Sequence, residues 1–135
     1  MFQIIYISTA TVPFSASDLD ALLHKARLRN DAAGLTGMMV YSQGEFLQAL
    51  EGETAAVLET FARIEEDPRH SDVVTLRRGP ISSGRMFENW SMGFKDVSDA
   101  HKTKAAVRIN DRIVLSKFDE FAAADFLQAC SRSQN

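Results

Sequence analysis

Hydrophobic and polar residues alternate in several short stretches of the chain, and this period of two predicts β-strands. The first stretch, residues 2–8, is mostly apolar on both faces, which is typical of a central strand covered on both sides. Four further stretches predict strands at residues 35–42, 44–52, 73–76 and 87–94. The turn residues Ser42, Gln43 and Gly44 separate the second strand from the third, which predicts that these two strands are antiparallel neighbours.

Helical periodicity appears in the segments between these strands. One helix is predicted to run to about residue 30, with Ser15 or Ser17 as its N-cap and Asp18 complementing its dipole. A second helix is predicted at residues 54–66, with an apolar stripe on one side. The resulting order, β-α-β-β-α-β-β, predicts a ferredoxin-like α+β sandwich in which the two helices cover one face of the sheet.

The character of the chain changes after residue 95. Residues 96–106 predict a polar, helical connection, and apolar residues within 118–127 predict a further helix with one apolar side. We expect these C-terminal helices to cap the second face of the sheet, unless a partner covers it.

Composition and charge are those of an ordinary globular protein. The chain has 135 residues, of which 45% are hydrophobic and 24% charged, which predicts one domain with a substantial core. Its net charge of -3, with scattered basic residues, argues against a nucleic-acid partner. The single cysteine, the start without a basic signal region and the lack of a long apolar run predict a cytoplasmic protein without a membrane span.

Signatures of common active sites and metal sites are missing. The chain has neither a phosphate-binding glycine loop nor a zinc-protease motif. The three histidines, His24, His70 and His101, lack the spacing of metal ligands, so we expect no metal site. No serine or cysteine has a recognisable histidine and carboxylate partner. We therefore expect that the chain is not an enzyme.

One glutamine stands out within the third predicted strand. Gln48 shares a strand face with Phe46 and Leu50, so its amide is predicted to lie among buried apolar side chains. An amide in that position must find hydrogen-bond partners, or it costs about 1–3 kcal/mol. It is either a core glutamine satisfied by nearby backbone or part of a functional site. Tyr6, on the first strand, poses the same question for its hydroxyl group.

Three further polar residues lie on the inner sides of the predicted helices. Asn30 continues the apolar stripe four residues beyond Ala26, and it is either a C-terminal cap or an amide facing a pocket. Arg63 and Asp67 are four residues apart and share a helix face, so they are either a surface ion pair or a clamp on a bound ligand. In this topology a planar ligand fits between the two helices, with one edge over Tyr6 and Gln48.

Seven sequence motifs, in this order and spacing, resemble those of the BLUF domain, a blue-light sensor that uses FAD. The resembling stretches in the first half are IYIS at residues 5–8, RN at 29–30, GLTGMMVY at 34–41 and FLQALEG at 46–52. The second half adds RI at residues 63–64, DPRH at 67–70 and NWSM at 89–92. The overall match spans residues 2–94 and is specific as a whole, whereas each motif alone is a weak signal.

The resemblance implies a role for each of the singled-out residues. Tyr6 would donate an electron and a proton to the photoexcited flavin, and Gln48 would bridge Tyr6 and the flavin edge. The remaining implied flavin contacts are Asn30, Arg63, Asp67 and His70. The implied signal transmitters are Trp90 and Met92. Some family members carry a serine at the position of Ala26, so one flavin contact is missing here.

The sequence thus predicts a blue-light photoreceptor with FAD as its cofactor. Residues 1–95 would form the flavin-binding domain, and residues 96–135 a C-terminal helical extension of the same compact unit. The resemblance is to short, single-domain members, so we expect a homo-oligomer that signals to a separate effector protein. Two alternatives stay open: a flavin-free protein-interaction module, and a small ferredoxin-like hydrolase that uses Arg29 and Asn30.

Overall fold

The computed structural model describes residues 1–82, 84–87, 91–98, 108–109, 112–113 and 115–132. Its main sheet has five strands in the order β4-β1-β3-β2-β5. These strands are β1 (Phe2–Ala10), β2 (Thr36–Ser42), β3 (Glu45–Gly52), β4 (His70–Pro80) and β5 (Gly93–Asp96). The helices are α1 (Ala16–Ala33), α2 (Thr54–Glu66) and α3 (Glu120–Arg132). A short ribbon of β6 (Arg108–Ile109) and β7 (Arg112–Ile113) and a 3-10 turn (Leu115–Lys117) precede α3.

The sheet combines an antiparallel core with one parallel edge strand. Strand β1 is antiparallel to both β3 and β4, and β2 is antiparallel to β3. Gln43 and Gly44 make the predicted hairpin turn with positive φ angles of 43° and 91°. Strand β5 then adds to the outside of β2 in parallel. The predicted ferredoxin-like α+β fold is confirmed, with β5 as an addition at the edge.

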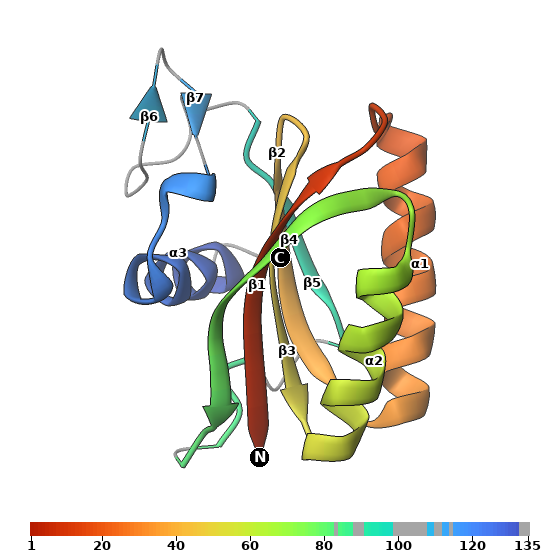
Figure 1. Ribbon diagram of the computed structural model, residues 1–135, viewed down its shortest axis with the longest axis vertical. Coiled ribbons are helices and arrows are strands. Elements are labelled where there is room, and N and C mark those ends of the chain that lie inside the picture. Colours follow the sequence, from red (N-terminus) through yellow and green to blue (C-terminus); the bar gives the residue numbers. More distant parts are fainter. Residues whose placement is uncertain (83, 88–90, 99–107, 110–111, 114, 133–135) are drawn as a thin grey trace.

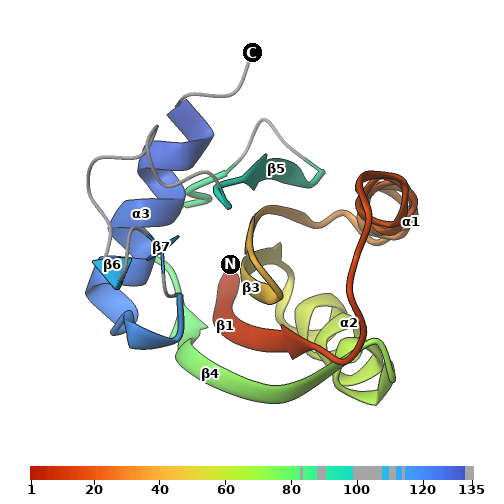
Figure 2. The same cartoon turned by 90° about the horizontal axis from the view of Figure 1, so that it is seen from above.

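The two faces of the sheet carry different layers. Helices α1 and α2 lie on one face and α3 on the other (Figures 1 and 2). Side chains from alternate positions of the strands therefore enter two separate cores. Tyr6, Met39 and Phe46 belong to the core beneath α1 and α2, whereas Ile5, Val40 and Leu47 belong to the core beneath α3. The prediction of two helices on one face is confirmed, and α3 is the one of the predicted C-terminal helices that lies on the other face within the described residues.

Helix α1 begins and ends as its sequence predicts. The Ser15 side chain accepts a hydrogen bond from the Asp18 backbone N–H, and the Asp18 side chain accepts one from the Ser15 N–H. The helix ends at Gly34, whose φ of 70° is readily adopted only by glycine. These two ends place Ala26 and Asn30 on the buried side of α1.

Two strand predictions are wrong in their extent. Strand β4 runs over His70–Pro80 rather than residues 73–76, because an edge strand with two largely exposed faces shows little alternation. The fifth strand begins at Gly93 rather than at residue 87. The buried carboxylate of Glu51 accepts the backbone N–H groups of Met86 and Phe87, which removes these donors from any strand pairing.

Parts of three expectations fall outside the described residues. The structure does not describe Trp90, which is a predicted signal transmitter. It also does not describe residues 99–106 of the predicted helical connection or the last three residues of the C-terminal extension. Asp96 ends β5 and so does not start a helix. No helix in the described ranges is long and apolar enough to cross a membrane.

Candidate functional site

Tyr6 and Gln48 face each other across neighbouring strands. The register of β1 and β3 makes them direct partners, on the face covered by α1 and α2. The Tyr6 hydroxyl donates a hydrogen bond to Gln48 Oε1 at 2.5 Å, and both side chains are buried. The other end of the amide, Nε2, lies 4.0 Å from the sulfur of Met92. The Gln48 amide is thus satisfied by side chains and not by nearby backbone.

The Tyr6 phenol is held in its neutral form. It is fully buried, and its ring centroid lies 5.0 Å from that of Phe61 on α2. Burial raises the pKa of Tyr6 far above its usual value of 10.0, while the charge of Arg29 acts in the opposite direction. The phenol therefore keeps its proton at physiological pH and can donate it to Gln48.

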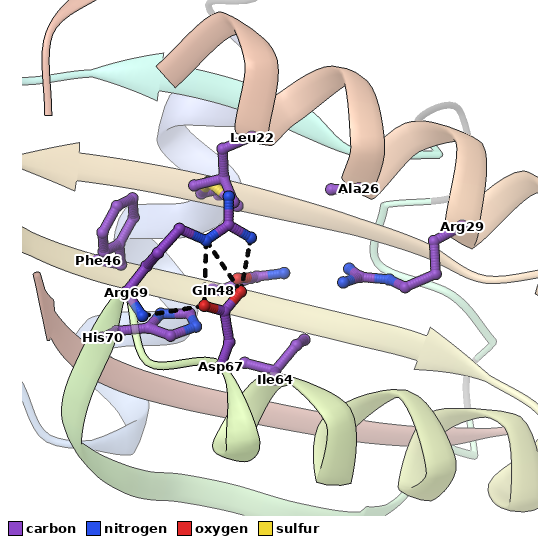
Figure 3. A pocket seen from close by; sticks show the side chains of 10 residues that line it. Leu22, Ala26, Arg29, Phe46, Gln48, Ile64, Asp67, Arg69 and His70 are labelled. Carbon is purple, nitrogen blue, oxygen red and sulfur yellow. Dashed lines mark hydrogen bonds and ion pairs between the residues drawn. The ribbon is translucent and has the colours of Figure 1, made fainter. Parts of the chain in front are cut away.

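A small cavity opens beside Gln48 between α1 and α2 (Figure 3). Its walls combine apolar side chains from both helices with polar ones from the segment that follows α2. The lining residues are Leu22, Ala26, Arg29, Met39, Phe46, Gln48, Ile64, Asp67, Arg69 and His70. The open space is about 30 Å³, whereas ligand pockets typically measure about 300–1,000 Å³. A ring of flavin size needs more room than these side-chain positions leave.

Of the two alternatives for Arg63 and Asp67, the surface ion pair between them is wrong. Asp67 pairs with Arg69, whose Nε lies 3.0 Å from Oδ1 and whose Nη2 lies 2.5 Å from Oδ2. Arg63 instead forms an exposed ion pair with Glu59 at 2.9 Å, and it does not line the cavity. The reason is the chain path: α2 ends at Glu66, so Asp67 no longer follows the helical spacing that would pair it with Arg63.

The hydrogen bonds of Arg69 keep the Asp67 carboxylate charged. They are the largest cause that lowers the pKa of Asp67, from 3.8 to about 2. The cavity therefore has a fixed anion and a fixed cation next to each other on its α2 side.

Asn30 is fully buried, as its place on the helical stripe predicts, but it faces the approach to β5. Its Nδ2 donates to the Ser91 carbonyl at 2.7 Å, and its Oδ1 accepts from Arg29 Nε at 3.3 Å. The Asn30 side chain is therefore not the helix cap, a role that Gly34 fills. Arg29 lies at the cavity and extends from α1 toward Gln48 (Figure 3).

His70 closes one end of the cavity. Its Nδ1 lies 3.2 Å from the Ser8 hydroxyl, and its ring lies edge-on to Phe46 with 6.0 Å between centroids. Burial lowers the pKa of His70 below 6.5, with the charge of Asp67 opposing that shift. A neutral imidazole is therefore favoured at physiological pH.

Of the expected site residues, Gln48, Asp67 and His70 line the cavity, and Tyr6 and Met92 contact Gln48. Asn30 lies next to this group. Arg63 is not among them, and Trp90 lies outside the described residues. Sequence reasoning considered Arg29 only for a hydrolase and gave Arg69 no role of its own. The sequence does point to Arg69, because it lies in the DPRH stretch between Asp67 and His70, which are both predicted flavin contacts.

The chemistry of these residues fits a flavin. Leu22, Ala26 and Ile64 offer apolar walls to a flat ring from two sides. The carbonyl and nitrogen edge of a flavin needs hydrogen-bond donors, and the amide of Gln48 and the guanidinium of Arg29 both reach this cavity. FAD is therefore compatible with the donor set as well as with the apolar walls.

Comparisons with known proteins give a consistent result. The family model "BLUF: Sensors of blue-light using FAD" matches residues 1–93. Photoactivated adenylate cyclase subunit beta of Euglena longa is 40% identical over 87 residues, which cover 64% of this chain and 10% of the relative. The chain thus spans about a tenth of the length of that curated relative.

Two solved structures share the fold over nearly the whole chain. The dark-state structure of BlrB, a BLUF protein, superposes with a TM-score of 0.78 at 26% identity and covers 98% of this chain and 96% of that one. The photo-activated state of BlsA superposes with a TM-score of 0.80 over 99% of this chain and 96% of that one. Its identity of 22% supports the shared fold alone.

Proposed function

The chain belongs to the BLUF family of blue-light sensors that use FAD, and from this premise we propose that its light response runs through Tyr6 and Gln48. Residues 1–93 match a family of blue-light sensors, as the resemblance of the sequence implies. The observation that carries the proposal is the buried hydrogen bond from the Tyr6 hydroxyl to Gln48 Oε1. Bound FAD supplies the absorption of blue light and an acceptor for an electron.

The amide of Gln48 is suited to act as a switch. Tyr6 would be the donor to bound FAD, and its neutral phenol holds the hydroxyl proton against Gln48 Oε1. Gln48 carries an acceptor at one end and donors at the other, so rotation or tautomerisation changes which group faces each neighbour. Neither change alters the charge of a buried side chain, which avoids a large desolvation cost.

The proposed flavin contacts are those of the cavity and its rim. Gln48 and Tyr6 would hold the group from the sheet, and Asn30 would adjoin it from α1. Asp67 and His70 line the side near α2. Arg69 replaces Arg63 in this set, because Arg69 lines the cavity while Arg63 is paired with Glu59 on the surface.

The output is proposed to leave through Met92 and the segments that follow β5. Residues 1–95 would form the flavin-binding part and residues 96–135 an extension of the same compact unit. In support, α3 carries Phe126 and Leu127 into the core of the second sheet face. Trp90 stays a proposed transmitter. The relatives named photoactivated adenylate cyclases suggest that the effector can be an enzyme; here we propose a separate cytoplasmic partner and a homo-oligomeric sensor.

Substituting the two tyrosines one at a time tests this function. Tyr6→Phe should bind FAD but lose a reversible red shift of flavin absorption under blue light, because only the hydroxyl is removed. Tyr41→Phe is the matched control, since Tyr41 is buried in the same core and should keep the shift. A Tyr6→Phe protein that still shifts refutes the relay. A colourless wild-type protein that added FAD does not restore favours a flavin-free interaction module.

A further inference from the structure

Helix α1 holds two successive carbonyl groups on the approach to β5. Asn30 Nδ2 donates to the Ser91 carbonyl at 2.7 Å, and Arg27 Nε donates to the Met92 carbonyl at 2.9 Å. Residues three apart on a helix lie on the same side, so the two donors form one continuous contact. This contact lies directly before the first residue of β5, Gly93.

The side chain of Met92 is held from the opposite side by the sheet. It is fully buried, and its sulfur lies 4.0 Å from Gln48 Nε2. Its methyl group lies over Gly37, where an added Cβ would be 3.4 Å from Met92 Cε and 2.2 Å from the Ala49 carbonyl oxygen. The Met92 sulfur therefore contacts the Gln48 amide, while the Met92 carbonyl accepts a hydrogen bond from α1. These two contacts hold the residue from both sides.

We propose that Arg27 is a positioning residue of the photocycle: its bond to the Met92 carbonyl sets where the Met92 sulfur meets Gln48. The inference rests on the proposed function of Gln48 and Met92. The Arg27 side chain is exposed although its bond to Met92 is part-buried, and it has no ion pair within the described residues, so water can compete for this bond. Such a hydrogen bond can break and form again. A movement of Met92 can therefore be transmitted through Arg27 to α1.

A substitution at Arg27 tests the position of Met92 separately from flavin binding, which a substitution at Asn30 does not. Asn30 belongs to the proposed flavin contacts, so its substitution would change flavin binding and Met92 together. Arg27 does not line the cavity. Arg27→Met removes the donor and the charge but keeps a long side chain.

We expect Arg27→Met to bind FAD and to show the full red shift, but to recover in the dark more slowly. The slowing should be about fivefold, which corresponds to the loss of one ordinary hydrogen bond that draws Met92 back to its dark position. Arg27→Lys keeps the charge and a donor, so its dark recovery should be slower than that of the wild type and faster than that of Arg27→Met. The control is Lys25→Met, which removes an exposed cation from the same helix and should leave the rate unchanged.

A double substitution separates positioning from general stabilisation. With Met92→Ala there is no sulfur to place against Gln48, so adding Arg27→Met should not slow recovery further. Additive effects of the two substitutions, or an unchanged rate in Arg27→Met alone, overturn the inference. Loss of flavin or of the red shift in Arg27→Met also overturns it, because Arg27 would then act on the pocket.

Hydrogen exchange in the dark supplies a readout that does not depend on photochemistry. Arg27→Met should speed exchange of the backbone amides at residues 91–96, while those of α2 keep their wild-type rates. Unchanged exchange at residues 91–96 overturns the inference even if the wild-type protein has no photocycle. A wild-type protein that binds FAD without a red shift would instead contradict the proposed function.

Discussion

Arg69 engages Asp67 through its side chain and its backbone at once. The guanidinium contacts both carboxylate oxygens, and the Arg69 backbone N–H donates to Asp67 Oδ1 at 2.9 Å. The charge of Asp67 is therefore already balanced on the α2 side of the cavity. Arg29, on the α1 side, forms no ion pair within the described ranges, and burial lowers its pKa. A cation without an ion-pair partner in the described ranges is thus available at the cavity.

We expect Arg29→Met to weaken FAD binding by about ten- to a hundredfold, because one charge-assisted hydrogen bond is worth about 1.5–3 kcal/mol. The dissociation constant is measured by flavin fluorescence during titration. Arg63→Met is the matched control on the other helix and should bind FAD like the wild type, since Arg63 pairs with Glu59 on the surface. Equal losses in both variants would mean that overall charge, rather than position, matters.

His70 should make stability depend on pH in the mildly acidic range. Burial lowers its pKa below 6.5 in the folded protein, so the unfolded chain binds a proton more readily. Stability is therefore greatest above pH 6.5 and falls as the pH drops through that value.

Thermal unfolding of the flavin-free protein from about pH 8 to about pH 5 measures this effect. His70→Asn should flatten the fall in Tm, whereas His24→Asn, at an exposed site on α1, should leave it unchanged. A fall of the same size in His70→Asn would assign the pH dependence to other groups.

The buried carboxylate of Glu51 should be important for stability. It accepts hydrogen bonds from the Gln3 amide at 2.8 Å and from the Met86 and Phe87 backbone N–H groups at 2.9 Å each. Glu51→Ala would remove the partner of the Met86 and Phe87 N–H groups, at about 1–3 kcal/mol for each, whereas Gln3 Nε2 would keep its contact with the Met86 sulfur at 3.0 Å. We expect a loss of about 3 kcal/mol or more in the free energy of unfolding, measured with denaturant.

Glu53 is a suitable control for that measurement. It is the exposed N-cap residue of α2, and its side chain makes no capping hydrogen bond. Glu53→Ala should change the free energy of unfolding by less than about 0.5 kcal/mol. Similar losses in the two variants would show that the contacts of Glu51 add little.

Met92→Ala should separate photochemistry from output. The red shift should remain, because Tyr6 and Gln48 keep their hydrogen bond, while the contact from Gln48 Nε2 to the Met92 sulfur is lost. In the wild type, blue light should change hydrogen exchange in residues 91–98 and 115–132. The variant should show a smaller change there. Light-dependent exchange confined to α1 and α2 in the wild type would place the output surface elsewhere.

Local sequence determined much of this protein. The strand period of two put Tyr6 and Gln48 on faces that require hydrogen-bond partners, and the helical period put Asn30 on the buried side of α1. The caps at Ser15 and Gly34 follow from chemistry within a few residues. Such features depend on neighbours in the chain, so they can be predicted without knowledge of what packs against them.

Tertiary structure decided which of these groups meet. The pairing of β1 with β3 places Tyr6 opposite Gln48, and the parallel addition of β5 to β2 brings in Met92. Asp67 pairs with Arg69 rather than Arg63 because α2 ends before it. The fifth strand starts late because Glu51, distant in sequence, binds the N–H groups of Met86 and Phe87. These outcomes depend on competition between distant groups, which the period of a local stretch does not contain.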